Sequence, residues 1–153
     1  MRRLALSGLA LGALMAVGTA QAEPLILEGD DMDQVTAAGV AFVEANRYRL
    51  KEGNQLTILG YTQLITKHRQ SKNIHRFLID FGDFYALLAK EYAAQYDPEG
   101  LAFDLKAFDQ FAKSALRLYT EVVQVDGIME KVEAQGKIEA MRGLLEKITR
   151  MSR

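Results

Sequence analysis

Residues 73–95 read NIHRFLIDFGDFYALLAKEYAAQ, and this stretch decides the fold class. Its large apolar side chains recur at spacings of three and four residues, which places them on one face of an α-helix. They are Phe77, Phe81, Phe84, Tyr85, Leu88 and Tyr92. The pattern predicts an amphipathic helix whose aromatic face lies in a packed core, because aromatic side chains are more often core residues than ligand contacts.

The sequence after this stretch also has a helical pattern. YDPEG at residues 96–100 combines a proline with a closing glycine and predicts a tight turn. Asp104 is well placed to cap the next helix. Asp126 and Gly127 predict a break, and a last helix follows it.

Two segments precede residues 73–95. The acidic residues within 28–33 favour the N-terminus of a first helix, which we expect to end near Gly53. Asn54 is a candidate cap for a second segment, residues 55–66. That segment is rich in β-branched residues and partly alternates, so both helix and strand remain open for it.

Five glycines fall inside the predicted helices, where each costs about 1 kcal/mol relative to alanine. Close approach of two helices is one explanation, and simple tolerance is the other. Gly136 and Gly143 are seven residues apart and could share a contact face. The five are Gly39, Gly60, Gly82, Gly136 and Gly143.

The N-terminus has the features of an export signal. Arg2 and Arg3 precede an apolar, uncharged run over residues 4–19, and the sequence AQA then ends at Ala22. This order is typical of a signal peptide, and we expect residues 1–22 to be cleaved after Ala22. The expected product is a single domain, residues 23–153, in the periplasm.

The composition narrows the possible classes of protein. The chain has no cysteine, which excludes disulfides and thiolate chemistry. Its formal charge is -1, and removal of Arg2 and Arg3 would lower the charge by two units. This gives no overall indication of nucleic-acid binding, and we expect no membrane span after signal cleavage. The predicted fold is all-α, an antiparallel bundle of four to five helices.

One strongly basic segment lies within this acidic background. No Asp or Glu occurs between Gly53 and Ile79. The candidate binding residues in this interval are Lys67, His68, Arg69, Lys72, His75 and Arg76. Such a cluster attracts an anionic partner. The alternative is that the cations complement a helix C-terminus and remain solvated, although His75 and Arg76 would then lie at the start of the next helix, where cations are disfavoured.

The two histidines do not predict a metal site. In one continuous helix His68 and His75 would lie about 10.5 Å apart along the axis, too far to bind one ion together. An exported four-helix protein of this size resembles the cytochrome b562 type of bundle, in which a Met of the first helix and a His of the last helix ligate haem. Met32 is suitably placed, but the last helix contains no His, so the resemblance implies no haem site. We expect no cofactor.

These observations support three hypotheses about function. The first is a non-enzymatic exported protein that binds a protein or an anionic ligand through residues 67–76. The second is a carrier that holds a cofactor or apolar ligand in the core, between the two aromatic-rich helices. The third and weakest is an enzyme that uses Asp80, Asp83 and His75 in acid–base chemistry. No set of residues has catalytic spacing, so we predict no catalytic residue.

Overall fold

The computed structural model describes residues 32–153, with side chains from Val35 onward. This part of the chain forms five helices and no strand, so the all-α prediction is confirmed for it. The helices are α2 (Met32–Ala45), α3 (Glu52–Lys67), α4 (Ile74–Gln95), α5 (Leu105–Val123) and α6 (Glu130–Met151). Residues 55–66 lie within α3, which resolves the choice between helix and strand. The predicted signal peptide, its cleavage after Ala22 and the domain start at Glu23 lie outside the described residues.

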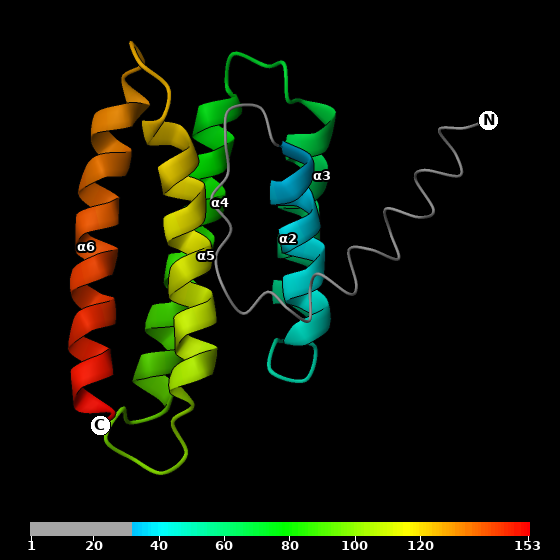
Figure 1. Ribbon diagram of the computed structural model, residues 1–153. Coiled ribbons are helices and arrows are strands. Elements are labelled where there is room, and N and C mark those ends of the chain that lie inside the picture. Colours follow the sequence, from blue (N-terminus) through cyan, green and yellow to red (C-terminus); the bar gives the residue numbers. More distant parts are fainter. Residues whose placement is uncertain (1–31) are drawn as a thin grey trace.

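Successive helices run in opposite directions (Figure 1). α5 packs against α4 on one side and against α6 on the other. α2 and α3 form a helical hairpin, and α3 lies next to α4. This arrangement is compatible with the predicted bundle.

Aromatic contacts hold the α2–α3 hairpin against the other helices. Phe42 of α2 packs edge-on against Tyr85 of α4, with ring centroids 4.9 Å apart. Phe42 also lies 5.4 Å from Phe111 of α5. Tyr61 of α3 stacks on Phe81 of α4 at 5.0 Å. Each such pair contributes about 0.5–1.5 kcal/mol beyond its buried area, so the aromatic face predicted for α4 is the centre of the core.

The predicted turn and cap before α5 are both present. The N–H of Gly100 donates to the carbonyl of Asp97 at 2.8 Å and closes the turn. The Asp104 side chain accepts hydrogen bonds from the N–H groups of Lys106 and Ala107, as an N-cap residue does. The sequence therefore predicted the start of α5 correctly.

The first helix is shorter than the sequence suggested. α2 ends at Ala45 rather than near Gly53. The side-chain amide of the buried Asn46 donates a hydrogen bond to the carbonyl of Phe42 at 3.0 Å. The N–H of Leu50 in turn donates a hydrogen bond to the carbonyl of Asn46. These hydrogen bonds favour a non-helical turn at this point over continuation of α2. The expected cap at Asn54 is also wrong, because α3 begins at Glu52.

The glycines divide into two groups. A β-carbon at Gly82 would lie 2.6 Å from Cε1 of Tyr119, and one at Gly39 would clash with Cγ2 of Thr62. Because glycine has no β-carbon, Gly82 allows α4 to lie close to α5, and Gly39 allows α2 to lie close to α3. A β-carbon at Gly136 or Gly143 would meet nothing within 4 Å among the described residues, so a shared contact face for these two is wrong.

The break predicted at Asp126 and Gly127 is present between α5 and α6. Gly127 has φ +80°, a conformation that glycine adopts readily.

Candidate functional site

The basic segment forms the connection between α3 and α4. Lys67 is the last residue of α3, and the N–H of His68 closes that helix on the carbonyl of Leu64 at 3.0 Å. The chain turns through residues 68–73 before α4 begins at Ile74. His75 and Arg76 therefore lie in the first turn of α4, as the sequence suggested.

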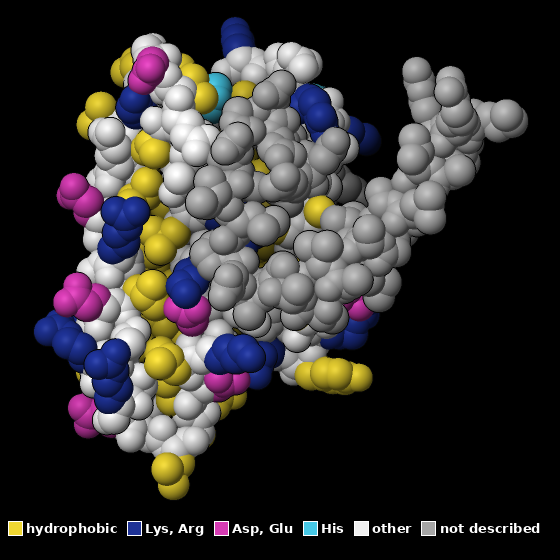
Figure 2. Space-filling view, in the orientation of Figure 1, with side chains coloured by type: hydrophobic (Ala, Val, Ile, Leu, Met, Phe, Trp, Pro, Cys, Tyr) yellow, Lys and Arg dark blue, Asp and Glu magenta, His cyan; other side chains and the backbone are white. Residues whose placement is uncertain are grey.

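The side chains of this segment differ in exposure. Lys67, His68 and Lys72 are exposed, whereas Arg69 and His75 are partly buried. No carboxylate in the described part of the chain forms an ion pair with Lys67 or Lys72. Figure 2 shows basic and histidine side chains at the end of the molecule where α3 and α4 are joined. Lys67 and Lys72 therefore present positive charge at that end that no described carboxylate pairs.

Arg76 differs from the other candidate binding residues. Its two terminal nitrogens bind the carboxylate of Glu133 on α6 at 3.1 and 2.7 Å. Its Nε lies 3.4 Å from Asp80, the i,i+4 pair expected from the sequence. The hydrogen bond to Glu133 raises the pKa of Arg76, and the same bond lowers the pKa of Glu133. Arg76 therefore joins α4 to α6, and its charge is already compensated.

The residues of the enzyme hypothesis do not form one catalytic group in the described structure. Asp83 accepts a hydrogen bond from the Tyr119 hydroxyl at 2.6 Å and from Nζ of Lys137 at 2.6 and 2.7 Å. Asp80 faces Arg76. No hydrogen bond joins His75 to either carboxylate within residues 35–153.

The group of Asp83, Tyr119 and Lys137 was missed by sequence reasoning. These residues come from α4, α5 and α6 and are 36 and 54 positions apart, so no local spacing indicates them. Burial, followed by the hydrogen bond to Asp83, raises the pKa of Tyr119, and its hydroxyl stays a donor. The group connects three helices at one point.

The histidines belong to different segments, one at the end of α3 and one in α4. No group of three or more His, Cys, Asp or Glu that could hold a metal ion occurs among the described residues. Met32 is the first residue of α2, and its side chain lies outside the described part. Over residues 32–153, no helix combines the length and hydropathy needed to cross a membrane.

Comparisons of the chain with protein-family models, with curated proteins and with solved structures find no match.

Proposed function

We propose that this protein acts by binding, without catalysis, and that its partner is an acidic protein surface or another anionic ligand. The contact is the α3–α4 connection, with Lys67, His68, Arg69, Lys72 and His75. The observation that carries the proposal is the exposure of Lys67 and Lys72 without an ion pair in the described structure, within a stretch that has no acid from Gly53 to Ile79.

Helix stability alone does not account for this cluster. Lys67 and His68 complement the negative end of the α3 dipole. Lys72 and His75 lie at the positive end of α4, where a cation is unfavourable. Asn73, the N-cap of α4, makes no side-chain hydrogen bond to the helix, and the first turn contains no acid. An anionic partner would compensate both the helix end and the cations.

The proposal includes export. Residues 1–22 act as a signal peptide that is cleaved after Ala22, and the helical domain works in the periplasm. An intact mass that begins at Glu23, measured on protein from a periplasmic fraction, is the expected observation. Full-length protein in the cytoplasm would contradict this part.

A charge-reversal experiment tests the binding surface. The variant Lys67→Glu with Lys72→Glu is compared with Arg142→Glu plus Lys147→Glu on α6, which makes the same change in net charge at two exposed positions. The probe is a ten-residue glutamate peptide, titrated at several salt concentrations and followed by NMR. We expect chemical-shift changes centred on residues 67–76, affinity that falls with salt, and a loss of about tenfold in the first variant alone.

Two results would contradict the proposed surface. Equal weakening in both variants would mean that the peptide responds to net charge rather than to this segment. Unchanged binding in Lys67→Glu with Lys72→Glu would exclude the segment directly.

A further inference from the structure

The start of α2 lies at the same end of the molecule as the basic α3–α4 connection (Figure 1). α2 and α3 are antiparallel neighbours, and the hydroxyl oxygens of Thr36 and Thr66 are 3.0 Å apart. Thr66 is one residue from the end of α3, whereas Thr36 is four residues from the start of α2. With a rise of 1.5 Å per residue, α2 therefore begins about 4.5 Å beyond the last residue of α3, beside the turn that carries the basic side chains.

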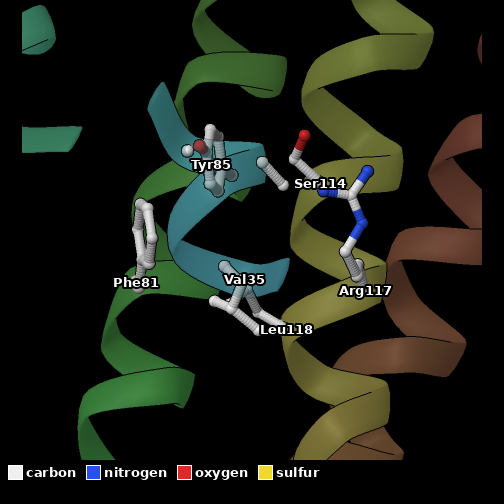
Figure 3. A pocket seen from close by; sticks show the side chains of 8 residues that line it. Val35, Phe81, Tyr85, Ser114, Arg117 and Leu118 are labelled. Atoms are coloured by element: carbon white, nitrogen blue, oxygen red, sulfur yellow. The ribbon is translucent and has the colours of Figure 1, made fainter. Parts of the chain in front are cut away.

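Packing fixes the first turn of α2 at this place. Val35, three residues after the start of the helix, is only 2% exposed. Together with Phe81 of α4 and Leu118 of α5, it lines a small recess between the three helices (Figure 3). The chain that precedes α2 is thus attached to a fixed point next to the α3–α4 connection.

The residues around the start of α2 are strongly acidic. No Lys or Arg occurs between Arg3 and Arg47, and four acids lie within six positions: Glu28, Asp30, Asp31 and Asp33. Residues 28–33 are named here the acidic segment. An extended chain spans at most about 3.5 Å per residue, so even Glu28 can lie no more than about 14 Å from the start of α2. All four acids are within reach of the α3–α4 connection.

The dipole of α2 does not account for the whole segment. A helix N-terminus favours acids, but the effect fades within the first turn. Asp33 belongs to that turn, whereas Glu28 and Asp30 precede the helix in the sequence. These outer acids need another reason for their charge.

The α3–α4 connection has the complementary charge. Lys67 and Lys72 are exposed and form no ion pair with the described carboxylates. The antiparallel register set by Thr36 and Thr66 brings position 33 of α2 near the level of Arg69. Positions before α2 then run toward the turn and Lys72.

We infer that the acidic segment pairs with the α3–α4 connection of the same molecule and competes there with the anionic partner. Exposed ion pairs are individually weak and are screened by salt. A segment on a short tether, however, acts at an effective concentration in the millimolar range. The segment thus lowers the affinity for weakly charged ligands, and a strongly acidic partner displaces it. The competition rests on the function proposed above, whereas the pairing itself does not.

The first experiment tests the pairing without any partner. Lys67→Glu with Lys72→Glu is compared with Arg142→Glu plus Lys147→Glu by two-dimensional NMR at low salt. We expect the amide signals of residues 28–31 to shift in the first variant alone, and the difference from wild type to vanish at about 0.5 M sodium chloride. The wild-type signals should not depend on protein concentration, because the pairing is intramolecular.

The second experiment tests the competition with the ten-residue glutamate peptide. One variant combines Glu28→Gln, Asp30→Asn and Asp31→Asn, in which asparagine preserves the ability to cap α2. The matched control makes the same change in net charge at three exposed positions elsewhere: Glu91→Gln, Glu139→Gln and Glu146→Gln. We expect the first variant to bind the peptide about fivefold more tightly than wild type at low salt, and the control to gain less than twofold.

Four outcomes would overturn the inference or one of its two parts. Unshifted signals of residues 28–31 in Lys67→Glu with Lys72→Glu would exclude the pairing. Signals that depend on protein concentration would mean that the acidic segment pairs with a second copy of the chain. Equal peptide affinity in the two triple variants would exclude the competition. Absence of peptide binding by wild type and by both triple variants would contradict the proposed function and the competition together, and the amide signals would still decide the pairing.

Discussion

Tyr119 and Arg117 are two residues apart on α5 and point to opposite sides of it, because two positions turn an α-helix by about 200°. The Tyr119 hydroxyl donates to Asp83, which also binds Lys137. Arg117, by contrast, has a buried Nε with no partner. One polar side chain is thus fully satisfied, and the other is not.

The helices that surround Tyr119 and Arg117 explain why the first has a hydrogen-bond partner and the second has a buried Nε without one. On the Tyr119 side, α5 packs between α4 and α6, and each helix supplies a polar group that meets the others. On the Arg117 side, the neighbours come from α2 and α4 and are mainly apolar. The first side contributes to stability through a complete hydrogen-bond network. The second side keeps a buried guanidinium Nε without a hydrogen-bond partner, which is unfavourable for stability.

The largest expected effect on stability comes from a substitution that disrupts the packing around Tyr119. Gly82→Ala should lower the free energy of unfolding by about 2–3 kcal/mol, because the new β-carbon would lie 2.6 Å from the buried Tyr119 ring. Gly136→Ala, where nothing lies within 4 Å in the described structure, should raise that free energy by about 0.4–1 kcal/mol. Urea denaturation of both variants measures the contrast. Equal effects of the two substitutions would show that the Gly82 contact is not tight.

Two smaller effects, of opposite sign to each other, are expected from substitutions at Arg117 and at Tyr119 themselves. Arg117→Met should raise the free energy of unfolding by about 1 kcal/mol, since it removes a buried Nε that has no hydrogen-bond partner and keeps much of the apolar volume. Tyr119→Phe should lower the same free energy by about 1 kcal/mol through loss of its hydrogen bond. Thermal and urea unfolding of the two variants check both values. Destabilisation by Arg117→Met would mean that the protein itself satisfies this charge.

The helices were predictable because their signals are local. The aromatic stripe of α4, the turn at residues 96–100 and the cap at Asp104 each depend on residues a few positions apart. The end of α2 was not predicted, because it depends on the buried side chain of Asn46. Asparagine at that position has no distinctive sequence pattern, and its burial follows from tertiary packing.

The burial of a polar stripe on α5 was not predictable for a related reason. Ser114, Arg117 and Glu121 follow each other at spacings of three and four residues, and such a polar stripe normally indicates a solvent-facing surface. Here Ser114 and Glu121 are buried and Arg117 is partly buried. This face of α5 is covered because the α2–α3 hairpin lies against it. The position of the hairpin follows from tertiary packing, which the sequence of α5 does not indicate.

The smallest expected effect concerns Glu133, next to the Tyr119 network. Its carboxylate binds Arg76 at 2.7 Å and lies 3.4 Å from Lys137. The hydrogen bond from Arg76 lowers the pKa of Glu133 below its ordinary value of 4.5. A carboxyl group whose pKa is lower in the folded state adds stability above the unfolded-state pKa and loses it as the pH falls through the folded-state pKa.

Glu133→Gln should therefore lower the free energy of unfolding at neutral pH by less than about 1 kcal/mol, because the pair is well exposed to solvent. The difference from wild type should be constant above about pH 5.5 and should shrink as the pH falls below 4.5. Glu139→Gln is the matched control, since Glu139 lies on the same helix, is exposed and forms no ion pair within residues 35–153. Urea unfolding of both variants from pH 3 to pH 7 gives the two profiles. Parallel profiles would mean that Glu133 responds only as a surface charge, and that the ties between α4 and α6 depend on Asp83 and Lys137.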